Sequence, residues 1–297
     1  EDVEAGAALN QALRKHPKVF DDLYCNLVAS GEQSGSLDTM LRRLADYQES
    51  MLKLRAKVKQ AMIYPAAIVT FAIIVAIFML WKIIPVFGGI YQELGAQLPG
   101  LTAAVLGLSN FVSDYIILIV VGLIAIVVLY RRWSKTPAGR EIVDRTKLKL
   151  PVMSNLMQKI SLSRFTRTLS TLIGGGVPML ESLKIASTTT DNVIIERQVL
   201  NARQMVSEGK SLHDSLKQAS QDQFPAMMIQ MVNVGESTGT LDEMLGKLAN
   251  FFDDEVDNAV SSLLSALEPL VLIFVGGIVG TLVISMYLPL FNLIQQF

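Results

Sequence analysis

The last stretch of the sequence carries no charged residue from Pro269 to Phe297, a run of 29 residues. A helix needs roughly 20 apolar residues to cross a bilayer. A buried core helix of this length would normally show a polar side, and this run shows none. The sequence therefore predicts a membrane-spanning helix over 268–297.

Two further apolar stretches have the same character. From Ala66 to Pro85 the only charged residue is Lys82, close to the far end, where its long side chain can reach the interface. Tyr115–Tyr130 is short for a hydrocarbon core of roughly 30 Å, but the uncharged stretch 101–113 before it would lengthen the helix. With 51% hydrophobic residues and a mean hydropathy of +0.41, the chain suits a membrane. We predict spans over 63–86 and 114–131.

The basic residues orient these spans. Four stand before the first span (Lys53, Arg55, Lys57, Lys59) and four after the second (Arg131, Arg132, Lys135, Arg140), whereas the connecting segment 87–113 has neither Lys nor Arg. Because basic flanks stay in the cytoplasm, 1–62 and 132–267 are predicted to be cytoplasmic and 87–113 to be a periplasmic loop or helix.

The chain also repeats itself. The segment from Gly31 to Asp38 (GEQSGSLD) returns from Gly235 to Asp242 (GESTGTLD), 204 residues later. The same offset pairs Phe20 with Phe224, Pro65 with Pro269 and Pro85 with Pro289. Self-similarity of this kind indicates a duplicated unit. We expect an all-α membrane protein in which two helical-bundle domains each lead through a long helix into a span.

Copy two begins with segments that copy one does not show. Helical sequence runs from about Asn155 to Ile173, a Gly174–Gly176 turn follows, and Pro178 opens another helix. The counterparts in copy one would precede residue 1. On this repeat argument we expect the first domain to be truncated by roughly fifty residues or more.

The repeated turn has a local physical explanation for most of its residues. Gly31 and Gly235 are predicted to end a helix as left-handed caps. Ser36 and Thr240 would cap the next helix, Thr240 in a capping box with Glu243. The turn motif is Gly31, Glu32, Gly35 and Asp38, with Gly235, Glu236, Gly239 and Asp242, both aspartates lying at a positive helix end. Glu32 and Glu236 stay open between a structural hydrogen bond and a partner contact.

The two copies differ in charge just before their spans. Copy one carries the basic group Lys53, Arg55, Lys57 and Lys59, and copy two carries the acidic group Asp253, Asp254, Glu255 and Asp257. A basic group there suits anionic membrane lipid. One hypothesis is that the two long helices meet through these groups, within or between subunits, or present them to partners. The alternative is two solvated helix faces.

Several functions lack the residues they require. A net charge of −1 predicts no nucleic-acid binding. Cys25 is the only cysteine, and His16 and His213 sit in no ligand-spaced cluster, so we expect no metal site and no cofactor. The sequence 208–211 (EGKS) resembles a phosphate loop, but Gln204 stands where glycine is required, so a helix end is favoured. No catalytic constellation appears, and an enzyme is not expected.

The spans bear on a second alternative, a transporter. Such proteins place ionisable groups along their pathway, and the only charged residue within the apolar runs 66–85, 115–130 and 269–297 is Lys82. Gly276 and Gly280 are spaced for close helix packing, either within the chain or in an oligomer.

At this point the sequence resembles the PilC/GspF family of inner-membrane platform proteins of type IV pilus and type II secretion machines. The resemblance covers essentially the whole chain. It rests on both copies of the turn, on Tyr64-Pro65, 98–102 (LPGLT), 164–169 (RFTRTL), 176–178 (GVP), Glu268-Pro269 and 287–289 (YLP). The segments 23–28 and 255–258 look more like the pilus branch, with type II secretion as the alternative.

The resemblance implies partners that composition does not reveal. It implies a homo-oligomer in the bacterial inner membrane beneath the pilus. Expected partners are the pilus extension and retraction ATPases, pilin subunits, and other inner-membrane pilus alignment proteins. The implied role is to couple the ATPases to pilin insertion and extraction.

Overall fold

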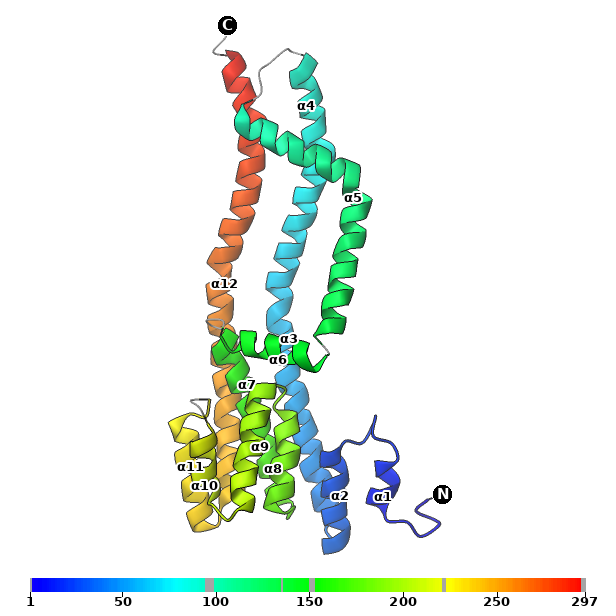
Figure 1. Ribbon diagram of the computed structural model, residues 1–297, viewed down its shortest axis with the longest axis vertical. Helices are drawn as coiled ribbons and strands as arrows, with labels where there is room; N and C mark the ends of the chain where they lie inside the picture. The colour runs from blue at the N-terminus through cyan, green and yellow to red at the C-terminus, as the bar shows by residue number, and fades with distance from the viewer. Residues whose placement is uncertain (1, 94–98, 135, 150–152, 221–222, 295–297) are drawn as a thin grey trace. The chain divides into compact units, whose positions relative to one another are not determined.

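In the computed structural model the chain is all-α, and no strand occurs in the part that the structure describes (Figure 1). That part comprises residues 2–93, 99–134, 136–149, 153–220 and 223–294. The chain divides into two compact units, each assembled from two stretches of sequence. We call Glu1–Val58 with Pro137–Ser262 the polar unit, and Lys59–Thr136 with Leu263–Phe297 the apolar unit.

Both copies of the repeat lie in the polar unit. Copy one comprises α1 (Leu9–Arg14), α2 (Asp22–Ser34) and the start of α3 (Leu37–Phe78). Copy two comprises α7 (Met153–Gly174), α8 (Met179–Thr189), α9 (Val193–Ser207), α10 (Leu212–Ala219), α11 (Ala226–Thr238) and the start of α12 (Leu241–Ile294). Helix α6 (Pro137–Lys147) precedes copy two and contacts α7 and α9. By sequence offset, α1, α2 and α3 correspond to α10, α11 and α12.

Copy two has a continuous core drawn from all six of its helices. Phe165 and Leu169 on α7 and Leu245 and Leu248 on α12 are completely buried in it. Copy one is joined to copy two by a second cluster, in which Leu27 on α2 packs with residues of α7 and α8. Burying one such side chain stabilises the fold by about 1.5–3 kcal/mol. The α7–α8 pair of copy two therefore packs into its own core on one side and against copy one on the other.

The apolar unit contains the rest of both long helices. The π-helix η1 (Met79–Ile83) follows α3 and leads into α4 (Ile84–Glu93), and α5 is Gly100–Trp133. Among the described residues, three helical stretches are long and apolar enough to cross a membrane by length and composition: Leu37–Ile90, Gly100–Trp133 and Leu241–Leu288. The first two include the spans expected at 63–86 and 114–131, and the third overlaps the span expected at 268–297 as far as Leu288.

Helix α5 continues through 101–113, as its uncharged sequence suggested, but it is not straight. Tyr115 has non-helical backbone angles, φ −114° and ψ 16°, which bend the helix there. Before the bend, the hydroxyl of Thr102 donates to the carbonyl of Ser285 at 2.8 Å, and Ser109 donates to the carbonyl of Leu80 in the π-helix. These bonds satisfy backbone groups that lipid cannot.

Candidate functional site

The repeated turn has the same backbone geometry in both copies. The left-handed cap lies at Gly35 after α2 (φ 66°) and at Gly239 after α11 (φ 73°). The prediction that Gly31 and Gly235 are these caps is wrong by one helical turn. Both lie inside their helices, and each accepts hydrogen bonds from the two residues that follow the helix.

A close helix crossing explains why Gly31 and Gly235 are glycines. A Cβ atom on Gly31 would lie 3.0 Å from the Cα of Leu37, and one on Gly235 would lie 2.9 Å from the Cα of Leu241. Backbone atoms cannot give way as a flexible side chain can. The next helix therefore turns back directly over these glycines, and sequence alone did not separate this role from a cap.

The capping box predicted for copy two does not form. The Thr240 N–H donates to the carbonyl of Gly235 at 2.9 Å, so it is not available to Glu243. Glu243 instead pairs with Lys247 at 2.7 Å, and the Thr240 hydroxyl bonds that of Thr238 at 2.7 Å. The Thr240 N–H, which a capping box would use, is bonded in the left-handed cap motif instead.

The two aspartates of the motif have different surroundings. Both lie in the first turn of their helices, where a negative charge is favourable. Asp38 pairs with Arg42 at 3.0 Å on the exposed face of α3. Asp242 is half-buried, and its carbonyl accepts a 2.8 Å hydrogen bond from Ser170 of α7. The same motif is therefore more closely packed in copy two.

The two glutamates occupy equivalent structural positions. The carboxylate of Glu32 accepts from the backbone N–H groups of Leu9 and Asn10, at 2.6 and 3.0 Å. The carboxylate of Glu236 accepts from those of Leu212 and His213, at 2.7 and 3.0 Å. Each therefore occupies the free donors at the start of a short helix, α1 or α10, which gives both glutamates a structural role.

The repeat extends further toward the N-terminus than the sequence comparison suggested. Gly6 before α1 and Gly209 before α10 have almost the same left-handed conformation, with φ of 93° and 92°. Their offset is 203 residues, one less than elsewhere, so aligning the two copies at an offset of 204 does not pair these glycines. Gly209 follows the end of α9, and the Ser211 side chain accepts from the Asp214 N–H at 3.0 Å as an N-cap. The phosphate-like segment is therefore a helix boundary, as its sequence favoured.

The predicted Gly174–Gly176 turn is a packing junction between the two copies. The Ser30 hydroxyl of copy one donates to the carbonyl of Gly175. A Cβ atom on Gly175 would lie 2.6 Å from a methyl group of Leu27 and 3.2 Å from the sulfur of Met40. Copy one thus rests directly on the α7–α8 turn.

Of the two predicted charge groups, one pair comes together between the long helices. Lys57 of α3 pairs with Asp257 of α12 at 2.6 Å. The rest of the basic group lies elsewhere: Lys53 pairs with Glu49 of its own helix, and Arg55 and Lys59 are exposed.

Two of the four acidic residues pair with α7. Asp253 pairs with Arg167 at 2.6 Å and also accepts from Ser163, and Glu255 pairs with Lys159 at 2.5 Å. Asp254 is exposed. Half of the acidic group is therefore paired inside copy two, and a partner surface built from these residues stays a prediction.

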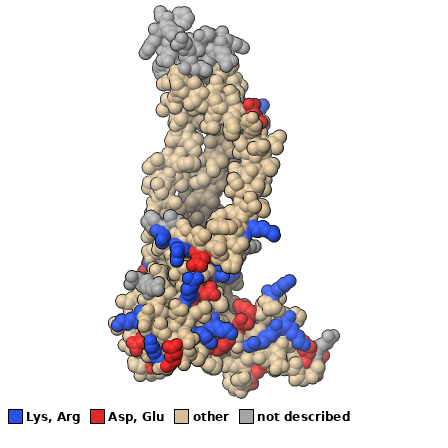
Figure 2. All heavy atoms as spheres, in the orientation of Figure 1, with Lys and Arg blue, Asp and Glu red and all other residues tan. Residues whose placement is uncertain are grey.

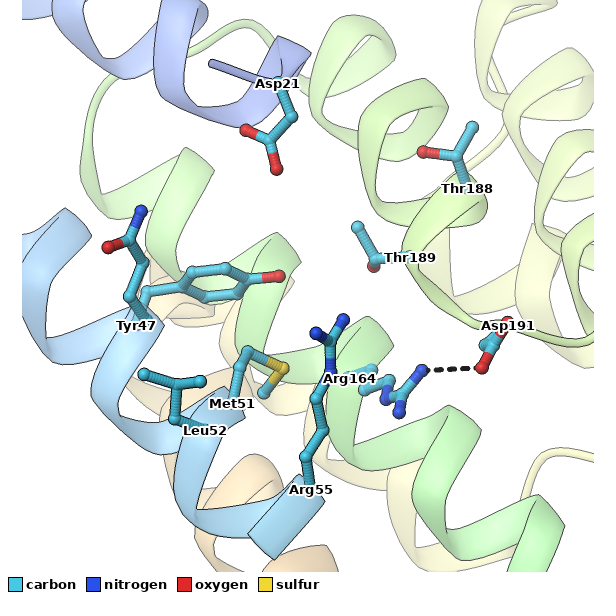
Figure 3. A pocket seen from close by; sticks show the side chains of 10 residues that line it. Asp21, Tyr47, Met51, Leu52, Arg55, Arg164, Thr188, Thr189 and Asp191 are labelled. Atoms are coloured by element: carbon cyan, nitrogen blue, oxygen red, sulfur yellow. Dashed lines mark hydrogen bonds and ion pairs between the residues drawn. The ribbon is translucent and has the colours of Figure 1, made fainter. Parts of the chain in front are cut away.

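A groove of about 410 Å³ opens in the polar unit where copy one meets α7 and α8. In Figure 3, Tyr47 and Arg55 project into it from α3, and Asp21 points in from the opposite side. Arg164 also borders the groove and pairs with Asp191 at 3.0 Å. The lining is charged on several sides, and it contains no histidine or cysteine. The groove therefore offers charged and hydroxyl groups for polar contacts.

Cys25, the single cysteine, lies on α2 and is 1% exposed. Burial raises the pKa of its thiol, and Arg14 nearby opposes this only in part. A raised pKa leaves less of the reactive thiolate. Among the described residues, no three or more His, Cys, Asp or Glu side chains are grouped so that they could hold a metal ion.

Charged side chains are distributed very unevenly between the units. Figure 2 shows basic and acidic side chains intermixed over the polar unit, while the drawn face of the apolar unit is almost free of them. Large apolar side chains such as Phe71 (69% exposed), Ile117 (79%) and Ile273 (72%) cover the apolar unit. Exposed apolar surface of this extent is typical of contact with lipid or with another membrane protein.

Comparison with known proteins gives the same relationship over both copies. A family model for the type II secretion system protein F matches residues 1–85 and 165–289, and each matched range contains one repeated turn. The chain is 41% identical over 291 residues to the type IV pilus assembly protein PilC of Myxococcus xanthus, spanning 98% of this chain and 69% of that protein. It is 44% identical over 293 residues to PilC of Thermus thermophilus, spanning 99% of this chain and 72% of that protein.

Secretion proteins match over the same length at lower identity. The type II secretion system protein F of Vibrio cholerae is 35% identical over 291 residues, spanning 98% of this chain and 71% of that protein. The turns, the clamped glutamates and the apolar helices all lie in the aligned length. The family predicted from the sequence motifs is confirmed: the chain belongs to the family of type II secretion system protein F and type IV pilus assembly protein PilC.

Proposed function

We propose that this protein is an inner-membrane platform of a type IV pilus assembly machine. The observation that carries the proposal is the higher identity to PilC proteins, 41% and 44%, than to protein F, 35%, over nearly the whole chain. The basic flanks support a topology in which the polar unit is cytoplasmic. In that topology both copies of the repeat are within reach of cytoplasmic motor proteins.

The coupling of ATPases to pilin movement is part of the same proposal. Helices α3 and α12 each run without interruption from residues of the polar unit to residues of the apolar unit. Each helix therefore connects the two units through a continuous backbone, which supports a role in coupling them. We propose that the extension and retraction ATPases bind the polar unit and that pilin helices contact the apolar unit.

A type II secretion platform is the second candidate, favoured by the 35% identity to protein F over the same length. Deleting the gene distinguishes the two. We expect the deletion to abolish surface pili and twitching, and the intact gene to restore both. A deletion strain that keeps its pili but loses protein export would assign the chain to secretion.

Site-specific cross-linking tests the placement of the partners. A photo-reactive residue at exposed Asp254 of the polar unit should capture an ATPase, and one at Phe71 of the apolar unit should capture pilin. Each position is the control for the other. Capture of pilin from position 254, or of an ATPase from position 71, would contradict the assignment.

A further inference from the structure

The apolar unit has two unused surfaces of complementary chemistry. The first is a groove of about 370 Å³ between α3 and α12, which meet around their equivalent prolines, Pro65 and Pro269. Its walls are mainly apolar and include Ile68, Val271 and Leu272. Glu268, at one end of the third span, supplies the only acidic group of the lining, and its carboxylate has no ion pair among the described residues.

The Glu268 side chain is exposed, so its carboxylate is accessible to a cationic group from another chain. Pairing with such a group would lower the cost of an ionisable residue at the end of a membrane span. Pro269 has no N–H, so the carbonyl of Ser265, which also lines the groove, lacks its helical donor. The groove therefore combines an apolar wall with two hydrogen-bond acceptors at one end.

The second surface is the spanning part of α5. No residue from Tyr115 to Trp133 is buried, and Ile117 and Leu118 are 79% and 70% exposed. This part ends in Arg131 and Arg132, and neither guanidinium has an ion pair in the stretches that the structure describes. A guanidinium offers five N–H donors, which suits a carboxylate together with a carbonyl.

The two surfaces lie at the same predicted depth. Glu268 stands where the third span leaves the cytoplasm, and Arg131 stands where the second span returns to it. The predicted topology makes α5 and α12 cross the membrane in opposite directions. Val127 lies four residues before Arg131 and Leu272 lies four residues after Glu268, so both are at the same expected depth. Further along the same side of α12, Gly276 and Gly280 have nothing within 4 Å of an added Cβ atom and leave room for a helix to approach.

We propose that the groove between α3 and α12 receives α5 of a second copy of this chain, with Glu268 paired to Arg131 or Arg132. The argument rests on charge complementarity, matched depth and two uncovered apolar surfaces on one chain. It depends on the proposed membrane topology but not on the choice between pilus and secretion machine. Each chain offers one groove and one α5, so a reciprocal exchange closes a two-fold dimer.

Disulfide cross-linking of the full-length protein in its native membrane tests this arrangement. In a Cys25→Ser background, one tagged copy carries Leu272→Cys and a second, differently tagged copy carries Val127→Cys. We expect oxidation to give a covalent dimer containing both tags. The matched control replaces Leu272→Cys by Ile284→Cys, which is also exposed but lies twelve residues further along α12, so we expect at least ten-fold less mixed dimer.

Charge reversal then tests the ion pair. Glu268→Arg should reduce the mixed dimer at least five-fold, and combining it with Arg131→Glu and Arg132→Glu should restore it. No mixed dimer from the 272/127 pair, equal yield from the control, or no response to charge reversal would overturn the proposal; lipid or another protein would then fill the groove. Surface pili are scored in the same strains. If the dimer forms but deleting the gene leaves the pili intact, the proposed function is contradicted and the dimer is not.

Discussion

The two copies of the repeat have the same local structure but differ in what covers them. Both have the left-handed glycine, the glycine at the helix crossing and the clamped glutamate. In copy two, Leu245 and Val256 of α12 are completely buried. Their counterparts on α3, Leu41 and Leu52, are 39% and 64% exposed. The short motif therefore specifies the turn, and the neighbouring helices decide which face is buried.

The difference arises because α7 and α8, which belong to copy two, also pack against copy one. One side of this pair packs into the core of copy two, and Leu172 and Ile185 pack against Leu27 and Leu44 of copy one. Copy one consequently uses a different face of its long helix, the one carrying Tyr47, which borders the pair. Equivalent leucines should therefore contribute unequally to stability.

The largest expected effect is at the buried leucine. Leu245→Ala should lower the free energy of unfolding by about 2–5 kcal/mol, because it removes apolar contacts and leaves a cavity. Leu41→Ala, the matched control at the equivalent position, should cost less than about 1 kcal/mol. Thermal unfolding and pulse proteolysis in detergent measure both. Equal losses would show that copy one is covered as fully as copy two.

The glycine at the helix crossing should respond alike in both copies. Gly235→Ala and Gly31→Ala each place a Cβ atom within 3.0 Å of a backbone Cα atom, so we expect each to cost about 1–3 kcal/mol. Gly107→Ala, where an added Cβ meets nothing within 4 Å, is the control. For Gly31→Ala, the rate at which a maleimide modifies Cys25 reports the loosening of copy one. An unchanged rate would contradict a tight crossing.

The sequence was sufficient for features set by composition or by short spacing. Uncharged runs predicted the three spans, and the offset between the turns predicted equivalent helices in both copies. It could not place the left-handed cap. Gly35 is required for a positive φ and Gly31 for a close helix crossing, and both requirements appear in the sequence simply as a glycine near the helix end. The packed Gly174–Gly176 turn was also missed, since its neighbour Ser30 is distant in sequence and only tertiary structure brings them together.

The glutamate clamp should have an intermediate and matched effect. Glu236→Gln and Glu32→Gln remove a charge that accepts two backbone hydrogen bonds, so we expect each to cost about 1–2 kcal/mol. Hydrogen exchange should accelerate at Leu212 and His213 in the first variant and at Leu9 in the second. Glu208→Gln, which removes a nearby exposed charge, should leave these amides unchanged. If neither amide set responds while partner binding is lost, the glutamates act through a partner instead.

The smallest effect is expected at the one ion pair that joins the two predicted charge groups. Lys57 and Asp257 are 51% and 44% exposed, and exposed pairs contribute under about 1 kcal/mol. Lys57→Glu should therefore barely change stability, and adding Asp257→Lys should recover what is lost. Lys59→Glu, two residues along the same helix, is the matched control for charge alone. If Lys57→Glu abolishes pilus output without changing stability, and the double reversal restores the output, the contact between the two long helices matters for function. If pilus output does not change, the pair is an ordinary solvated contact between the copies.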